Sequence, residues 1–415
     1  MIIGAMALVP GMPVIPFLIL AGCTAFIGRL AGRTEKEQLK QSEIKSHKSV
    51  SEKQPIEEML DMDRISIHVG VRLIGMVDPK KNSGIFDRIG ALRRKYAQQL
   101  GIIIPLVRLR DDINLETHVY EIRLFDHAVA KGRLEPEMFL AMDSGSVINK
   151  VPGIETTEPV YGLPAIWVSK ADKEKAELSG YTVIDPESVF ITHLSETLRK
   201  YAAELLTRED VQLLVDRLRK TQPSLVGEVV GELVPIGLLQ QVLKKLLANN
   251  IPIRELTAIL ESLSVNAVKT KDPGTLTELV RKSLSRTITA MSKNDSSRIP
   301  SIVMDPALEH KMLSSLKQQK EESTIGLTAD SLMDFSRKVA QAWMNVMEKG
   351  LEKVVLLCDS RLRLPLATML ERTVPPLSVI AYDEVVFGVE IEPVETISFH
   401  GTEVNKLQEQ ELVKT

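Results

Sequence analysis

A thiol and a carboxylate stand together at the end of a predicted strand. Cys358 and Asp359 follow the apolar run 354–357, and α/β folds commonly place functional groups at the carboxyl ends of strands. A nucleophilic cysteine needs a neighbouring base, yet no histidine stands nearby in the sequence. We therefore expect Cys358 to be a buried structural residue. Arg361 and Arg363 begin the next helix and could grip an acidic partner, but a solvated position is expected for both.

The seven histidines form no metal-binding motif, since neither H-E-x-x-H nor H-x-H occurs among them. His118 and His127 bracket a predicted hairpin, and without a third ligand they are expected to be ordinary strand-end residues. His193 follows a helix start, where anions can bind, but a surface position is expected for it. Phosphate-binding loops, dinucleotide fingerprints and nucleophile elbows are also missing from the sequence. No catalytic centre, metal site or cofactor is therefore predicted.

The N-terminal segment contains a candidate lipidation site. The tetrapeptide LAGC at 20–23 matches a lipoprotein cleavage box. However, a secretory signal begins with a basic region, and no charge precedes Arg29. Residues 13–30 would form a helix about 27 Å long, enough to span a bilayer core, with basic residues just beyond it on the cytoplasmic side. We therefore expect a transmembrane helix within residues 1–30, with Cys23 as an apolar residue inside it.

Composition indicates a folded chain of several domains. The 415 residues are 44% hydrophobic and 26% charged, which is typical of globular proteins. A net charge of −3 provides no general attraction to nucleic acid or acidic lipid. Two cysteines exclude a disulfide framework, and 4% aromatic residues are few for a base-stacking surface.

A charged linker is expected over residues 31–59. Basic and acidic residues are mixed along this segment, and few of its residues are apolar. This composition is typical of a solvated segment. Ile56 and Met59 add an apolar stripe at nearly helical spacing near its end. That stripe could cover part of its own domain or dock on a neighbouring subunit.

Periodicity predicts a first α/β subdomain over residues 60–135, completed by 181–205. The stretch SGIFDRIGALRRKYAQQLG has the pattern of an amphipathic helix, with Ser83 as its cap and Phe86 on its buried stripe. The order strand, helix, strand, strand suggests a small α+β sandwich. The predicted strands cover 65–78, 102–109, 117–126 and 127–134.

Residues 136–180 interrupt this pattern and are expected to form an inserted second subdomain, because proline, glycine and acidic residues are frequent there. After it, Asp185 and Pro186 predict a strong helix start, with an N-cap and a first-turn proline. The apolar residues of this helix fall on one stripe, and its period turns Thr192 away from that stripe.

The remaining chain is predicted to be a helical third subdomain at 206–290, a C-terminal α/β subdomain at 291–400 and a charged tail at 401–415. A helix pair at 238–263 has the spacing of a helix-turn-helix, but its net charge is too small for the phosphate contacts that DNA binding needs. Residues 291–299 are polar and are expected to be a boundary. The predicted later elements are helices at 305–319, 331–349 and 359–372 and strands at 353–358, 377–382 and 386–398.

Several sequence motifs occur in the same order as in a known protein family. They include VGVRLIGMVD, IFDRIGALRRKYAQQLGIIIPLVRLRDD, YGLPAIWV, GYTVIDPESVFITHLSE and VVLLCDSRLRLPLATMLER. Together they resemble the cytoplasmic half of the flagellar type III export gate, the FHIPEP (FlhA) family. LVPGMPVIPFLILA resembles the last transmembrane helix of that family. The resemblance covers residues 8–398, and DPESVFITHL is nearer the flagellar branch than the injectisome branch.

The resemblance implies a fold and a role. It implies one transmembrane helix, a charged linker and four cytoplasmic subdomains that assemble as a nonameric homo-oligomeric ring at the bacterial inner membrane. The ring would be a non-enzymatic docking platform for flagellar export chaperones with their substrates. Its other partners would be the export ATPase complex with its stalk component and the other export-gate membrane proteins, with no nucleic acid and no cofactor. Family members also carry a long N-terminal membrane region, so we expect a fragment, a split-gene product or a degenerate paralogue that does not drive proton-coupled transport alone.

The resemblance also implies binding residues. The family's chaperone cleft uses an acidic residue and an aromatic one in D-P-x-F-G-L and a threonine in A-T-H-L. These positions correspond to Glu158, Tyr161 and Thr192, with Glu in place of Asp and Tyr in place of Phe. The linker residues Ile56 and Met59 would dock on the adjacent subunit. The alternatives are an injectisome export gate, a truncated paralogue without transport, and a membrane-tethered enzyme that uses Cys358.

Overall fold

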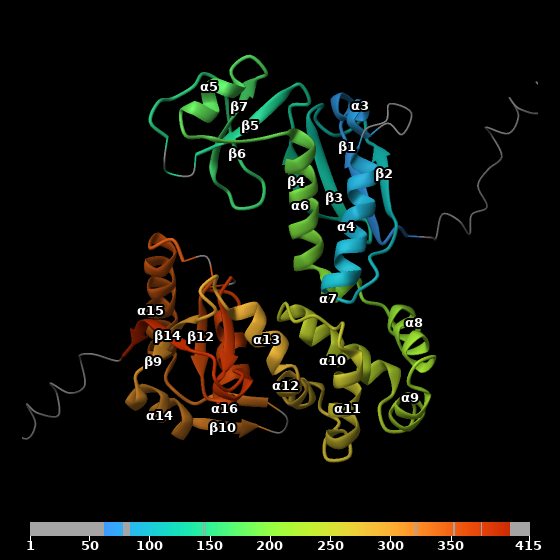
Figure 1. Cartoon of the computed structure of the whole chain (residues 1–415), viewed down its shortest axis with the longest axis vertical. Coiled ribbons are helices and arrows are strands. Elements are labelled where there is room, and N and C mark those ends of the chain that lie inside the picture. Colours follow the sequence, from blue (N-terminus) through green and yellow to red (C-terminus); the bar gives the residue numbers. More distant parts are fainter. Residues whose placement is uncertain are drawn as a thin grey trace, which may run out of the picture. The chain divides into compact units, whose positions relative to one another are not determined.

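The computed structural model describes residues 62–77, 84–143, 145, 147–319, 322–351, 353–374 and 376–398. The described residues from Asp63 to Ser398 belong to one compact unit, which contains three four-stranded sheets and a helical segment (Figure 1). The predicted transmembrane helix at 1–30, the linker with Ile56 and Met59, the Ser83 cap and the tail at 401–415 lie outside the described residues. In the described part of the chain, no helix is both long enough and apolar enough to cross a membrane.

The first sheet has the order β2-β1-β3-β4, with β1 parallel to β2 and the other pairs antiparallel. Helices α4 and α6 contact each other and lie side by side in front of this sheet (Figure 1). This arrangement confirms the predicted α+β sandwich. The elements are β1 (Ile65–Val69), η3 (Val71–Leu73), α3 (Ile74–Val77), α4 (Ile85–Gln99), β2 (Val107–Asp111), β3 (Val119–Leu124), β4 (His127–Arg133) and α6 (Pro186–Lys200).

The predicted strand 65–78 was too long, because the chain turns at Gly70. A Cβ atom at this position would lie 2.1 Å from the carbonyl oxygen of Glu116, so only glycine allows so close an approach. The prediction that Phe86 is buried was also wrong, since its side chain is exposed. The buried residues of α4 are Ile85, Ile89, Leu92 and Tyr96. Phe86 follows Ile85 directly, so its side chain points about 100° further around the helix, away from this buried side.

Local capping explains where α6 begins. Asp185 accepts a hydrogen bond from the backbone N–H of Ser188 at 2.8 Å, and Pro186 occupies the first turn, as the sequence predicts. Arg88 of α4 donates to the Ser188 hydroxyl at 2.8 Å and lies 3.3 Å from the Asp185 carboxylate. The cap is therefore also a link between the two helices.

The second sheet is inserted between β4 and α6 and has the order β6-β7-β5-β8, all antiparallel. It extends to Ile184, four residues beyond the predicted boundary of this insertion. Leu140 and Trp167 pack in the same apolar cluster as the first sheet. The elements are β5 (Met138–Met142), β6 (Ile154–Thr157), β7 (Pro164–Ser169), α5 (Lys173–Leu178) and β8 (Thr182–Ile184).

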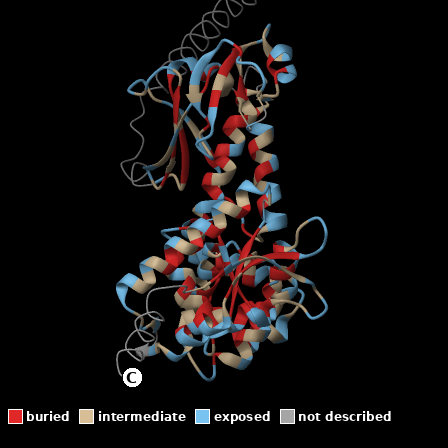
Figure 2. Cartoon of the chain, turned by 90° about the vertical axis from the view of Figure 1, so that its left-hand side faces the viewer, coloured by how far each residue is buried: buried red, intermediate tan, exposed pale blue. Residues whose placement is uncertain are grey.

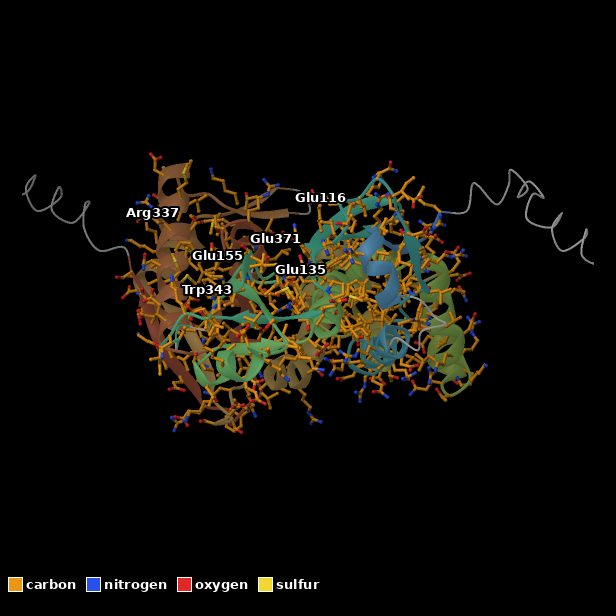
Figure 3. All side chains as sticks on the ribbon, turned by 90° about the horizontal axis from the view of Figure 1, so that it is seen from above. Glu116, Glu135, Glu155, Arg337, Trp343 and Glu371 are labelled. Carbon is orange, nitrogen blue, oxygen red and sulfur yellow. The ribbon has the colours of Figure 1, made fainter. Side chains whose placement is uncertain are left out.

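A buried carboxylate marks the entry into the inserted sheet. Glu135, labelled in Figure 3, is only 8% exposed. Its carboxylate lies 3.4 Å from the imidazole of His118 and 3.1 Å from the guanidinium of Arg133. His118 precedes β3 and His127 begins β4, which confirms the strand-end positions predicted for these histidines.

The segment after α6 is helical, as its pattern predicts. Helix α8 begins at a capping box in which Thr207 and Asp210 bond each other's backbone N–H groups, and Asp272 caps α12 ahead of Pro273. The helices are α7 (Ala202–Leu205), α8 (Arg208–Arg219), α9 (Pro223–Val229), α10 (Ile236–Ala248), α11 (Leu256–Asn266), α12 (Pro273–Ser283) and α13 (Ser285–Ser292).

The capping box also anchors the first strand to this helical segment. The Arg64 guanidinium lies 2.6 Å from the Asp210 carboxylate and also donates to the carbonyl of Leu205. Partial burial raises the pKa of Asp210, but the hydrogen bonds from Arg64 and Thr207 outweigh this effect and hold the pKa below its usual value. The ionised carboxylate is therefore the form that the folded state favours.

This lowered pKa predicts a pH-dependent contribution to stability. We expect Asp210→Asn to lower the free energy of unfolding at pH 7 by about 1.5–3 kcal/mol, since it removes a hydrogen bond to a charged group. The contribution is complete above the unfolded pKa of about 3.9 and is lost as the pH falls through the lower folded pKa. Urea unfolding of both full-length chains from pH 7 to pH 3 measures it. An equal difference at both ends of that range would contradict the prediction.

The third sheet has the order β13-β12-β9-β14, and all its neighbouring strands are parallel. Strand β9 is missing from the predicted elements, because its first residue, Ile299, falls at the end of the polar stretch 291–299. The elements are β9 (Ile299–Met304), α14 (Pro306–Ser314), β10 (Leu316–Gln319), β11 (Glu322–Ile325), α15 (Ala329–Glu348), β12 (Val355–Cys358), α16 (Ser360–Leu370), β13 (Ser378–Ala381), η5 (Tyr382–Glu384) and β14 (Ile391–Ile397).

The predicted helix 305–319 ends early. Helix α14 stops at Ser314, and the next residues form the hairpin β10–β11. The Ser315 hydroxyl donates to the carbonyl of Met312, and the carbonyl of Ser315 accepts the N–H of Gly326 at the far end of the hairpin. These bonds fix the turn between α14 and the hairpin.

Two large apolar clusters stabilise the described part of the chain. One runs through the first sheet, the helical segment and residues of β9 and β12, and the other lies around α15 and α16. Buried residues follow the strands and one side of each packed helix (Figure 2). The apolar stripe predicted for α6 also included Tyr201 and Leu205, but the helix ends at Lys200. Tyr201 is only half-buried. The other members of the stripe are buried: Val189, Phe190, Leu194, Leu198 and, in α7, Leu205.

Candidate functional site

The loop between β6 and β7 is built around a buried carboxylate. The side chain of Glu158 accepts the N–H of Val160 at 2.9 Å and the N–H of Tyr161 at 2.6 Å. Gly162 has φ = +70° and donates its N–H to the carbonyl of Glu158 at 3.1 Å. Because glycine adopts positive φ without steric cost, the loop closes tightly. Glu158 is only 6% exposed, so its carboxylate accepts hydrogen bonds from the loop backbone instead of from water.

The same loop presents an aromatic ring to the solvent. Tyr161 is 69% exposed, and Leu163 beside it is 40% exposed. The backbone N–H of Tyr161 is held by Glu158, so the ring projects from a fixed main chain. An exposed aromatic side chain on a rigid loop is typical of an anchor in protein interfaces.

Thr192 projects from the exposed side of α6, as its helical period predicts. The next residue does not follow its prediction. His193 was expected at the surface, but its side chain is 6% exposed, and its Nδ1 lies 2.7 Å from the hydroxyl of Tyr120 in β3. Burial lowers the pKa of His193, which favours the neutral imidazole.

Tyr120 of β3 packs against the buried side of α6. Its ring packs edge-on against Phe190 and His193 of α6, with centroid distances of 5.1 and 5.7 Å. Burial, and after it the negative charge of Glu158, raises the pKa of Tyr120. No direct hydrogen bond joins Thr192 to Glu158 or Tyr161 among these described side chains.

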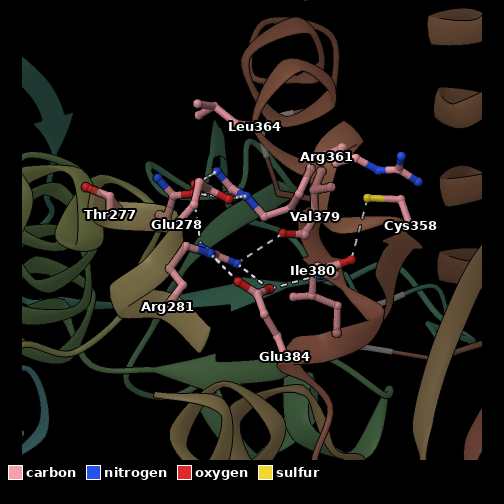
Figure 4. Close-up of polar contacts among 12 residues, drawn as sticks. Thr277, Glu278, Arg281, Cys358, Arg361, Leu364, Val379, Ile380 and Glu384 are labelled. Carbon is pink, nitrogen blue, oxygen red and sulfur yellow. Dashed lines mark hydrogen bonds and ion pairs between the residues drawn. The ribbon is translucent and has the colours of Figure 1, made fainter. Parts of the chain in front are cut away.

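The strand-end thiol has no reactive environment. Cys358 is fully buried, and its Sγ lies 3.7 Å from the carbonyl oxygen of Ile380 (Figure 4). Burial raises the pKa of this thiol, so the nucleophilic thiolate is disfavoured. The prediction of a buried structural cysteine is confirmed. Asp359 caps α16 and pairs with the exposed Arg361 at 2.9 Å.

Arg363 corrects another prediction, because it is 1% exposed rather than solvated. It pairs with Glu278 of α12 through two hydrogen bonds of 2.6 and 2.7 Å and donates to Asn249 at 2.8 Å. A second buried pair lies beside it, between Arg281 and Glu384 (Figure 4). These contacts join the helical segment to the third sheet, and nothing in the local sequence pattern indicates them.

An open groove of about 500 Å³ lies between α15 and α16. None of the described site residues, Glu158, Tyr161 and Thr192, lines it. Arg337, labelled in Figure 3, stands on α15 at this groove. The spacing of Leu332, Ser336 and Ala340, four residues apart, could have indicated this face. The lining residues are Leu332, Met333, Ser336, Arg337, Ala340, Met369 and Thr373.

Comparison with known proteins links the chain to flagellar biosynthesis proteins. It is 33% identical over 379 residues to the flagellar biosynthesis protein FlhA of Bacillus subtilis, covering 90% of this chain and 56% of the relative. It is also 33% identical over 383 residues to FlhA of Salmonella typhimurium, covering 92% of this chain and 54% of the relative. The chain therefore spans about half the length of the curated relatives that it matches.

Solved structures share its fold. The Chlamydia pneumoniae CdsV protein, at 27% identity, superimposes with a TM-score of 0.70 over 81% of this chain and 98% of CdsV, and a complex of CdsV with CdsO is similar to the same degree. The nonameric SctV-C of EPEC, at 18% identity, has the same fold, with a TM-score of 0.65 over 81% of this chain and 99% of SctV-C. The FHIPEP family model matches residues 1–390, and the chain therefore belongs to the FHIPEP family.

Proposed function

We propose that this chain acts in a flagellar type III export gate, as the cytoplasmic docking platform for export chaperones that carry their substrates. Its family and its flagellar relatives support the export role. The docking role is supported by one observation above all, the exposed ring of Tyr161 on a loop fixed by Glu158. We call Glu158, Tyr161 and Thr192 the docking surface.

The assembly is part of the same proposal. A homo-oligomeric ring at the bacterial inner membrane, with the described unit in the cytoplasm, fits the fold shared with the nonameric SctV-C. The linker residues Ile56 and Met59 would dock on the adjacent subunit. The complex of CdsV with CdsO supports a further protein partner, and the export ATPase complex with its stalk component is the partner that we propose. Other gate membrane proteins would complete the apparatus.

A docking platform accounts for the described side chains better than a membrane-tethered enzyme does. The enzyme alternative depends on Cys358, whose thiol is buried and whose pKa is raised. The Glu158 carboxylate of the docking surface instead holds the backbone N–H groups of Val160 and Tyr161. We therefore infer binding, not chemistry, as the task of this unit.

Calorimetric titration with a chaperone–flagellin complex tests the proposal. We expect saturable binding by the full-length chain in detergent, and Tyr161→Ala should weaken it by about 30-fold or more, since a truncated interface anchor costs about 2 kcal/mol or more. Phe387→Ala is the matched control, because this ring is also exposed but lies outside the docking surface. Absence of binding, or equal binding by both variants, would refute the docking role.

A further inference from the structure

The inserted sheet ends in a strand with one open side. β6 is the outer strand of the order β6-β7-β5-β8 and pairs with β7 alone. Three of its four residues, Ile154, Glu155 and Thr157, are exposed. Thr157 is the last residue of this strand, and the loop that presents Tyr161 begins with the next residue, Glu158. The open side of β6 therefore leads directly into the docking surface.

The hydrogen-bond pattern shows which backbone groups of β6 face outward. The N–H of Glu158 donates to the carbonyl of Leu163 at 2.9 Å, so these two residues form a hydrogen-bonded pair. Along an antiparallel ladder such pairs alternate with pairs that share no hydrogen bond. Thr157 lies opposite Pro164 in a pair without a hydrogen bond, which agrees with the missing N–H of proline. Glu155, two residues earlier, has the same position in the ladder. The N–H and C=O groups of Glu155 and Thr157 thus point away from β7, and we call them the free edge of β6.

The edges of the four-stranded sheets differ in their protection. Unpaired strand edges attract other strands, and proteins protect them with charges, prolines, bulges or covering elements. A bulge and Pro393 interrupt β14, a bulge interrupts β4, and β8 contacts α5. Arg108 and Arg110 project from β2, and in β13 the carbonyl of Val379 accepts a hydrogen bond from Arg281. β6, by contrast, has a regular register with β7 and no proline, and only one of its residues is charged.

The side chains of β6 define the strand that fits beside it. Ile154 is 47% exposed and lies on the same face of the sheet as Trp167, directly opposite it. Glu155, labelled in Figure 3, is exposed and projects from the other face, and no ion pair joins it to another described side chain. A paired strand places its side chains beside those of its neighbour on both faces. The fitting segment therefore has an apolar residue beside Ile154 and a lysine or arginine beside Glu155.

A second copy of this chain fits the free edge less well. If two β6 strands paired antiparallel through these groups, Glu155 of each copy would lie opposite Thr157 of the other. The two Glu155 side chains would then be diagonal neighbours on one face, about 7–8 Å apart. Their like charges would repel each other, whereas a basic residue of another protein would be attracted. Charge therefore favours a different protein over self-pairing.

We propose that β6 binds its partner by strand addition. An extended segment of the chaperone–substrate complex, with alternating apolar and basic residues, pairs with the free edge, while the ring of Tyr161 anchors the partner at the end of β6. Main-chain groups provide the bonds in this mode of recognition, so one platform can receive partners of different sequence. The inference rests on the proposed docking function and specifies the conformation of the partner segment.

Hydrogen exchange of single backbone amides tests the inference in the full-length chain, with and without a saturating chaperone–flagellin complex. We expect the amides of Glu155 and Thr157 to exchange about tenfold more slowly in the complex, because each gains a hydrogen bond. The amide of Thr156 already faces β7 and is the internal control, which should change less than about twofold. If the complex binds but the amides of Glu155 and Thr157 remain unprotected, strand addition is wrong and the docking function stands.

A proline at the free edge provides a second test. Thr157→Pro removes an outward N–H and leaves the bonds to β7 intact, so it should weaken binding of the chaperone–flagellin complex about 5- to 10-fold. Thr157→Val keeps the N–H and is the matched control, with binding expected within about twofold of wild type. Equal binding by the two variants would overturn the inference.

A change of charge covers the case in which the proline disturbs the fold, which a lowered midpoint of thermal unfolding would reveal. Glu155→Lys should weaken binding about threefold, since it replaces an attraction across the added strand by a repulsion. Glu174→Lys makes the same change at an exposed position of α5 and should have no effect. Equal affinities of these two variants would contradict the basic residue proposed beside Glu155.

A synthetic probe separates this inference from the docking function. If the wild type does not bind the chaperone–flagellin complex, the capped peptide VKVKV replaces it at millimolar concentration. Slower exchange of the amides of Glu155 and Thr157 with this peptide would then mean that only the docking function fails. Unchanged exchange with the peptide would overturn strand addition as well.

Discussion

Replacing Glu384 with alanine is expected to lower the free energy of unfolding by about 3–5 kcal/mol, the usual cost of removing one partner from a buried ion pair. Glu384 is 3% exposed and Arg281 is 2% exposed. Their two hydrogen bonds measure 2.5 and 2.8 Å. Without the carboxylate, the hydrogen bonds that the guanidinium keeps are long ones to neutral acceptors, the side-chain oxygen of Asn249 at 3.3 Å and the carbonyl of Val379 at 3.4 Å. The N–H of Ala381 loses its acceptor as well.

Urea unfolding of the full-length variants at pH 7 measures this loss. Glu390→Ala is the matched control, since the Glu390 carboxylate pairs with Arg298 at 3.1 Å but both side chains are about half exposed. An exposed pair contributes about 0–1 kcal/mol, so the control should change little. Losses of equal size in the two variants would show that burial does not set the strength of the Arg281–Glu384 pair.

Gly101→Ala is expected to have the second large effect, about 2–5 kcal/mol. Gly101 ends α4 with φ = +77°, a conformation that costs an L-residue about 1–2 kcal/mol. A Cβ atom here would also lie 2.6 Å from the backbone N and Cα atoms of Arg254. Overpacking against main-chain atoms adds about 1–3 kcal/mol. The end of α4 contacts the helical segment through a hydrogen bond from the Ile253 N–H to the Leu100 carbonyl, 2.8 Å long. The clash would push these two parts of the chain apart.

Gly350 offers a close control for this substitution. It follows the last residues of α15 with φ = +79°, and a Cβ atom there meets nothing within 4 Å. Gly350→Ala should therefore lower the midpoint of thermal unfolding only by the conformational cost, and Gly101→Ala should lower it further. If calorimetry gives the same shift for both, the contact with Arg254 does not restrict residue 101.

The sequence predicted those parts of the fold that depend on neighbouring residues. Asp185 and Pro186 predict the start of α6. The spacing of the apolar residues in that helix predicts that Thr192 lies on its exposed side. Pairings between distant residues were not predictable. His193 and Arg363 were assigned to the surface because of their residue types, but Tyr120 and Glu278, which are 73 and 85 positions away, supply the hydrogen bonds that allow their burial.

In the candidate site, too, the residues could be predicted but their contacts could not. The family resemblance suggested Glu158, Tyr161 and Thr192, and these remain predictions about binding. The resemblance did not indicate that Glu158 is buried. Its burial depends on how the loop from Val160 to Gly162 folds back over the carboxylate and donates hydrogen bonds to it. Nor did any pattern connect Gly132 with Tyr120. Those two residues lie opposite each other only after β3 and β4 have paired.

The strand order of the third sheet has a consequence for biosynthesis. β9 pairs with β14, whose residues follow it by roughly 100 positions, and ribosomes add about 5–20 residues per second. The edge of β9 therefore waits about 5–20 s for its partner after it has been translated. Until then its backbone groups on that side are unpaired and can template the wrong strand. A chaperone that covers this edge during synthesis would prevent such mispairing.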